Sequence, residues 1–264
     1  MGKLLANKPL VEAIFELRWG HPVAPGQFED PNYQILVGLL FEAFKKAGYG
    51  YYERLETAAI PDQFSGHVVQ HRYRVGKDQW PLVQVGKGII TVNDTENYDW
   101  EDSFFPRCIQ AFKALHEKYP GDLGKLPFHS IVLKYIDAYE FDYDEKDLFD
   151  FLEDRMHLHI RIPKPLLGSA HLTGNPSGFA ADFSYDIPDI NANLRFKLAR
   201  GTRNSDNKTL LVWETEVVSV KNDVPLDEAG FSTWLTRAHD ITSNWFFKLI
   251  EGELEKEFSN EHNG

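Results

Sequence analysis

Cysteine is almost absent from this chain, since Cys108 is the single cysteine among 264 residues. One thiol excludes an intramolecular disulfide and a zinc site built from several thiolates. Long apolar runs are also missing, because no stretch reaches the roughly 18 apolar residues that a membrane-spanning helix needs. The first residues contain no apolar segment of signal-peptide length and no small-residue cleavage site. These features predict a cytoplasmic protein without a membrane partner.

Basic residues are in the minority, with 28 Lys and Arg against 40 Asp and Glu and a formal net charge of −12. No run of Lys or Arg forms a local basic segment, and an acidic protein is repelled by the phosphates of nucleic acid. We therefore expect no nucleic-acid partner. The hydrophobic fraction of 42% and aromatic fraction of 14% provide enough material for a substantial core, which excludes general disorder.

Catalytic signatures are lacking as well. The sequence contains neither Gly-x-Ser-x-Gly nor Gly-x-x-x-x-Gly-Lys-Ser/Thr. The segment 174–178 is the nearest match to a phosphate-binding loop, but Pro176 removes a backbone donor and no Lys follows. We predict a protein that is not an enzyme and that carries no cofactor.

Hydrophobic periodicity divides the chain into alternating strands and amphipathic helices. Strands are predicted at 11–19, 67–75, 80–85, 89–92, 131–140, 158–162, 178–187, 191–199 and 210–220, and helices at 32–47, 100–118, 147–156 and 227–258. Each half of the chain thus has the order strand, helix, antiparallel strands, longer helix. We predict an α+β fold in which residues 1–123 and 124–264 form two similar halves. Their strands would form curved antiparallel sheet, with helices on one face.

Three short segments resemble one family. Residues 9–19 begin with Pro, an apolar pair and Glu-Ala, and continue as an alternating strand that closes in Arg-Trp. This opening resembles that of a sporadically distributed bacterial family of uncharacterised proteins of about this length. Residues 133–137 and 238–247 resemble its mid-chain strand and closing helix, although Lys134 and Asp137 replace the family's Arg and Asn. The resemblance implies a fold and a bacterial source, and little about activity.

Two groups of side chains have the residue types of a metal site. His157 and His159 would place two imidazoles on one face of a strand, and Asp182 or Asp186 could complete the set. The second group is Asp182, Asp186 and Asp189, clustered carboxylates whose spacing does not match a calcium-binding loop. Ordinary solvated side chains explain both groups, and we expect no bound metal.

Charged residues also gather on the non-core face of the first strand. The candidate binding surface consists of Glu12, Glu16, Arg18, Lys134 and Asp137, and Glu140 of the same strand as Lys134 could extend it. The alternative is an exposed face whose charges form salt bridges with one another.

The closing helix has one continuous apolar stripe, so one of its faces must be buried. We expect Trp245 to lie in this buried stripe and Phe258 to contribute little to the stability of the monomer. Gly252 is the expected point of fraying, because glycine is a poor helix former.

These features favour a non-catalytic bacterial binding or interaction protein, an accessory or regulatory component that recognises another protein or a second copy of itself. The alternative is a small-molecule-binding protein or enzyme with a pocket between the sheet and the long helix. A metal-dependent nuclease that uses the aspartates is a third hypothesis, disfavoured by the net charge. An enclosed apolar cavity would favour the small-molecule hypothesis, and a broad exposed apolar patch would favour the protein partner.

Overall fold

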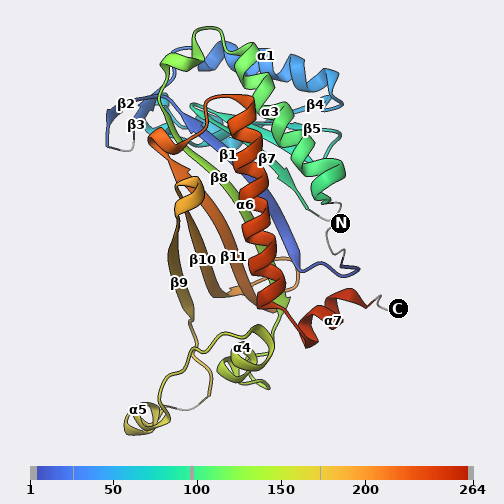
Figure 1. Cartoon of the computed structure of the whole chain (residues 1–264), viewed down its shortest axis with the longest axis vertical. Coiled ribbons are helices and arrows are strands. Elements are labelled where there is room, and N and C mark those ends of the chain that lie inside the picture. Colours follow the sequence, from blue (N-terminus) through green and yellow to red (C-terminus); the bar gives the residue numbers. More distant parts are fainter. Residues whose placement is uncertain (1–4, 26, 96–97, 173, 261–264) are drawn as a thin grey trace.

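The computed structural model describes residues 5–25, 27–95, 98–172 and 174–260. Its centre is a nine-stranded antiparallel sheet with the order β4-β5-β6-β7-β1-β8-β11-β10-β9. Helices pack on this sheet (Figure 1), so the predicted α+β class is confirmed. None of the helices within these ranges is both long and apolar enough to cross a membrane.

Most predicted elements are present. The sheet consists of β1 (Leu10–Trp19), β4 (Tyr51–Arg54), β5 (Val69–Arg74), β6 (Leu82–Gly86), β7 (Ile89–Asp94), β8 (Phe128–Glu140), β9 (Ala180–Ile187), β10 (Ala192–Thr202) and β11 (Thr209–Val220), and β2 (His21–Ala24) and β3 (Gln27–Glu29) form a separate hairpin. The helices are α1 (Tyr33–Lys46), α2 (Asp62–Ser65), α3 (Phe105–Lys118), α4 (Leu148–Met156), α5 (Lys164–Ser169), α6 (Glu228–Leu249) and α7 (Glu253–Ser259).

The strand order is similar on the two sides of the β1–β8 pair, with four strands beyond β1 and three beyond β8. The last strand of each meander, β7 or β11, lies beside the first strand of its own half. Joining β1 to β8 pairs two strands that would otherwise be open sheet edges. The larger hydrophobic core contains residues from both sides of position 123, including Phe15 and Phe231, whose ring centroids are 5.3 Å apart. The similarity of the two halves, residues 1–123 and 124–264, stays a prediction.

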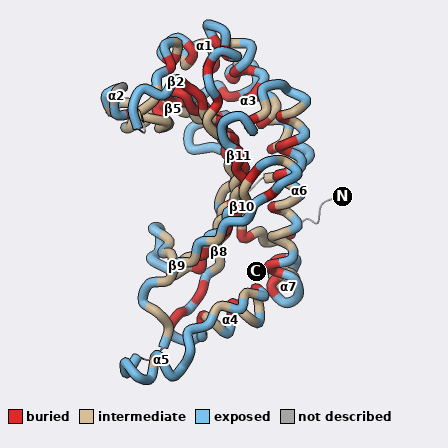
Figure 2. Tube along the Cα trace, turned by 60° about the vertical axis from the view of Figure 1, so that its left-hand side comes forward, coloured by how far each residue is buried: buried red, intermediate tan, exposed pale blue. Residues whose placement is uncertain are grey.

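The two faces of the sheet differ in chemistry. The odd-numbered residues of β1 from Ala13 to Trp19 are fully buried on the face that α3 and α6 cover. The even-numbered residues of β1 lie on the opposite face, because successive strand residues alternate. Figure 2 shows that the chain bends into a C, with α3 and α6 on its outer side. We call the inner, helix-free side the concave face.

One predicted strand was wrong. Residues 158–162 form no strand and instead follow α4 as irregular chain. His157 ends that helix with a left-handed backbone, φ 56°, and the Leu158 N–H donates to the Leu152 carbonyl oxygen over 2.8 Å. The apolar alternation of this segment was therefore a false strand signal.

The prediction of a single helix over 227–258 was also wrong, because α6 ends at Leu249 and α7 begins at Glu253. Gly252 lies between them at φ 105°, a backbone conformation that favours glycine. The turn brings α7 against α4, and Phe258 is only 6% exposed in a second hydrophobic core with Phe151 and Leu152. The expectation that Phe258 contributes little to stability is therefore wrong, whereas Trp245 is only half-buried.

Phe258→Ala should lower the free energy of unfolding by roughly 3–5 kcal/mol, as expected for truncating a buried phenylalanine. Phe64→Ala is the matched control, since Phe64 is 68% exposed and its truncation should cost less than about 0.5 kcal/mol. Urea unfolding of both variants measures the difference. Equal losses in the two variants would contradict the packing of α7.

Candidate functional site

A pocket of ≈ 360 Å³ lies between the sheet and α6. Its floor comes from β8 and β11, and one wall comes from the C-terminal part of α6. The segment before β1 and the turn at 98–102, which precedes α3, form the remaining walls. The pocket therefore joins residues from both ends of the chain.

Aromatic and aliphatic side chains form much of the lining. Phe246 and Phe247 contribute from α6, and Leu10 contributes from the start of β1. Trp100 stacks on His239, with ring centroids 3.8 Å apart and planes inclined by 8°. This stack closes one side of the pocket with flat apolar surface, which suits a ligand with an apolar body.

A chain of hydrogen bonds crosses the pocket. The Tyr98 and Tyr135 hydroxyl oxygens are 2.8 Å apart, and the Tyr135 hydroxyl lies 3.0 Å from His239 Nδ1. Burial lowers the pKa of His239 to about 4, so the imidazole is neutral near pH 7. Burial also raises the pKa of both tyrosines, which therefore stay protonated. The three side chains form a neutral, fixed polar array.

Asp137 is a carboxyl group in the floor of the pocket and is only 4% exposed. Burial raises its pKa to about 8, and the indole of Trp213, its cross-strand neighbour, lowers it only in part. No Lys or Arg of the described ranges forms an ion pair with it. The adjacent Thr215 Oγ1 is buried without a hydrogen-bond partner. Buried polar groups that lack a full set of protein partners are uncommon, which makes this floor a candidate binding site.

The pocket rim is acidic. Asp99, Glu101 and Asp102 lie together on the turn before α3, and the Asp99 carboxylate accepts a hydrogen bond from the Asp102 N–H over 2.7 Å. Lys8 is the basic residue of the lining, and its ammonium donates to the Tyr98 carbonyl oxygen over 2.6 Å. The lining thus carries more acidic than basic groups.

The predicted binding surface is divided between the two faces of the sheet. Glu12, Glu16, Arg18 and Lys134 lie on the concave face, whereas Asp137 lies on the helix-covered face with Tyr135. Positions 134 and 137 differ by an odd number, so their side chains point to opposite faces.

The concave-face members have partners of their own. Arg18 Nε lies 2.7 Å from Glu16, Lys134 Nζ lies 2.9 Å from Glu216, and Glu12 accepts a hydrogen bond from Asn93 over 2.7 Å. These contacts agree with the alternative of an internally paired polar face.

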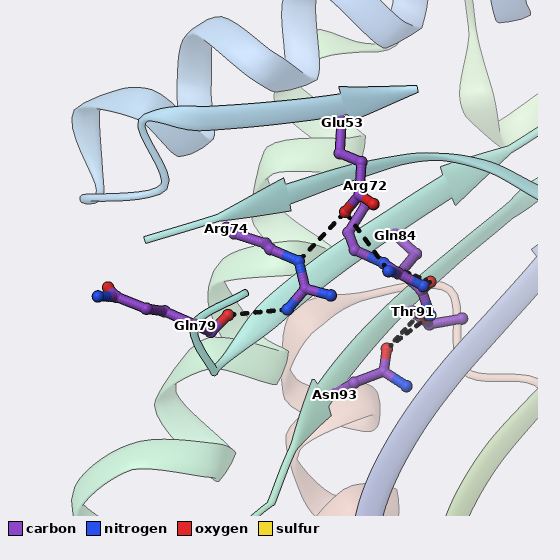
Figure 3. Close-up of polar contacts among 7 residues, drawn as sticks. All are labelled: Glu53, Arg72, Arg74, Gln79, Gln84, Thr91 and Asn93. Carbon is purple, nitrogen blue, oxygen red and sulfur yellow. Dashed lines mark hydrogen bonds and ion pairs between the residues drawn. The ribbon is translucent and has the colours of Figure 1, made fainter. Parts of the chain in front are cut away.

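The same pattern continues toward the edge strand β4, as Figure 3 shows. Arg72 donates to the Gln84 side-chain oxygen over 3.1 Å and 2.9 Å, and Arg74 Nε lies 3.2 Å from Glu53. Thr91 donates to the Asn93 side-chain oxygen over 2.6 Å. This network pairs its guanidinium groups within the protein and leaves Asp137 as the better candidate for a ligand contact.

The candidate metal ligands do not form a cluster. His157 Nε2 lies 2.7 Å from the Glu251 carbonyl oxygen, and His159 lies 3.5 Å from the Glu153 carboxylate. Asp182 lies opposite Lys197 in the register of β9 and β10, and Asp186 accepts a hydrogen bond from Asn193. Within the described part of the chain, no group of three or more His, Cys, Asp or Glu residues could hold a metal ion.

The sequence reasoning missed Tyr98, Thr215 and His239, because nothing local connects them. A signal for Asp137 was present, since it occupies an odd position in the alternation of β8 that also places Leu133 and Tyr135 in the core. A carboxyl group at a core position is expensive to bury, so its place in this alternation is itself a signal of function.

Asp137→Asn should change how stability depends on pH. The pKa of Asp137 is about 8 in the folded state against an ordinary 3.8, so folding retains a proton that the unfolded chain releases. The wild-type protein therefore loses stability as pH rises from about 4 to about 8, and the variant lacks this loss. The melting temperature of the variant minus that of wild type should increase across this window and then level off. A pH-independent difference in thermal melts would contradict the buried carboxyl.

No model of a known protein family matches the chain. Comparisons with curated proteins and with solved structures also give no significant match. The resemblance to a bacterial family thus stays a prediction.

Proposed function

We propose that this chain is a small-molecule-binding protein whose ligand occupies the pocket between β8, β11 and α6. The observation that carries the proposal is the ≈ 360 Å³ pocket itself, whose apolar walls surround the buried polar groups of Asp137 and Thr215. Ligand sites in proteins combine these features, a mainly apolar cavity with a few polar groups that orient the ligand. The fixed array of Tyr98, Tyr135 and His239 adds further hydrogen-bonding capacity.

A small-molecule-binding protein was the alternative hypothesis from the sequence, and we now favour it over a protein that recognises another protein. An enclosed apolar cavity is the feature that favours a small molecule, and this pocket is mainly apolar although it opens to solvent. The proposal retains the expectations of a cytoplasmic bacterial protein, of binding without catalysis, and of no nucleic-acid partner.

A protein partner is the second candidate function, and one observation favours it. Ile162, Leu166 and Leu172 are 43%, 62% and 60% exposed in the segment around α5. Figure 1 shows that α5 projects away from the sheet. Neighbouring exposed apolar side chains of this kind are typical of interaction sites.

Ser243→Trp should block the pocket. Ser243 lies in the lining on α6, and an indole there would occupy space that a ligand needs. A ligand at about 100 times its dissociation constant stabilises a protein by about 2.7 kcal/mol, so thermal-shift screening of a fragment library detects binding. Fragments that raise the melting temperature of wild type should not raise that of Ser243→Trp. They should still raise the melting temperature of Thr236→Trp, the control on the exposed face of α6. Fragment shifts that persist in Ser243→Trp would contradict binding in this pocket.

The double variant Leu166→Glu, Leu172→Glu tests the protein partner. Both side chains are exposed, so the melting temperature should change little. If the α5 segment docks a protein, a partner retained by wild type in a pull-down from the native host should be lost with the variant. Recovery of the same proteins with both baits would contradict docking at α5.

A further inference from the structure

We infer that the pocket binds an organic cation, an amine or amidine with an apolar body, and that Asp137 is its counter-ion. The inference rests on the proposed function and adds the chemical class of the ligand. It follows from the groups that surround the Asp137 carboxyl and from the charge of the pocket rim.

Among the described residues of β8, β11 and α6, no cation faces the Asp137 carboxyl, and Lys8, from the segment before β1, forms no ion pair with it. Trp213 and Thr215 of β11 are uncharged, and Tyr135 of β8 is protonated. His239 of α6 is neutral near pH 7 because burial lowers its pKa. A buried carboxyl with no positive partner in the protein is a ready partner for a cation supplied by the ligand.

The other walls also favour positive charge. Lys8 is the basic residue of the lining, and its ammonium donates a hydrogen bond to the Tyr98 carbonyl oxygen and is outnumbered by the acidic groups there, while Tyr98 itself is protonated. The rim carboxylates of Asp99, Glu101 and Asp102 create a negative potential at the pocket mouth. A carboxylate ligand would be repelled by this rim, whereas an ammonium or amidinium would be drawn in.

The apolar part of the ligand would lie against the aromatic walls. Trp100 and Phe246 line the pocket, and their ring faces attract a nearby cation as well as an apolar body. A volume of ≈ 360 Å³ leaves room for a ring and a short alkyl chain in addition to the charged group.

Cation binding would be coupled to release of a proton. In the free protein the Asp137 carboxyl holds its proton at neutral pH, since burial raises its pKa to about 8. When a protonated amine binds, Asp137 becomes the carboxylate of the ion pair and its proton passes to solvent. The affinity for a permanently charged ligand should therefore increase by up to about tenfold per pH unit below pH 8 and level off above it.

The test uses three probes of matched shape: 3-phenylpropylamine, 3-phenylpropanol and 3-phenylpropanoate. Dissociation constants are measured by ligand-observed NMR titration of the full chain at about pH 6 and about pH 8. We expect the amine to bind most tightly and to gain affinity at the higher pH, with no such gain for the alcohol. Asp137→Asn should lower the affinity for the amine by at least about tenfold. The affinity for the alcohol should stay nearly unchanged.

Glu214→Gln is the matched control. It also neutralises a carboxylate, and Glu214 adjoins Thr215 in β11 but lies on the concave face. Its amine affinity should equal that of wild type. Tighter binding of the alcohol or the propanoate, or an unchanged amine affinity in Asp137→Asn, would overturn the cation inference while leaving a small-molecule site in place. Failure of all three probes and of the fragment library to bind would instead overturn the proposed function, and this inference with it.

Discussion

The rest of this structure depends on the antiparallel pairing of β1 with β8. The two strands run side by side from Leu10 to Trp19, and their union joins the strands of both halves into one sheet. It also fixes the register, so that Phe15 and Leu133 lie on the helix-covered face and Glu16 and Val132 lie on the other. A shift of one residue would exchange these faces and bury the charges of β1.

The register gives the two faces of the sheet different roles. On the concave face, charged and amide side chains pair with one another across neighbouring strands, as in the Arg72, Arg74 and Glu53 group. On the helix-covered face the packing is mainly apolar, and two carboxyl groups buried in its strands differ: Asp94 is paired with Arg107 of α3, whereas Asp137 in the pocket is buried without a cation among the described residues. The cost of burying a carboxyl is large, and such costs are concentrated at functional sites.

Local sequence patterns predicted the elements well where a tertiary contact did not overrule them. The alternation in 11–19 and the apolar stripe of 147–156 correspond to β1 and α4 within a residue or two at each end. The edge strand β4 was not predicted, and the two elements that were predicted wrongly lie where α4 and α7 meet. There the turn at Gly252 returns the chain so that Phe258 packs near Phe151, a contact that no local periodicity encodes.

The sequence by itself determined the α+β class and the strand alternation, which divides the residues of each strand between two opposite faces. The opposite orientations of Lys134 and Asp137 follow from a period of two residues, which is a local property of the chain. Only the tertiary structure decided that Tyr135 meets His239, which is 104 residues distant, and that both face Tyr98. The physical reason is that a periodicity specifies which face of an element is buried, whereas packing of α6 on β8 specifies what that face contacts.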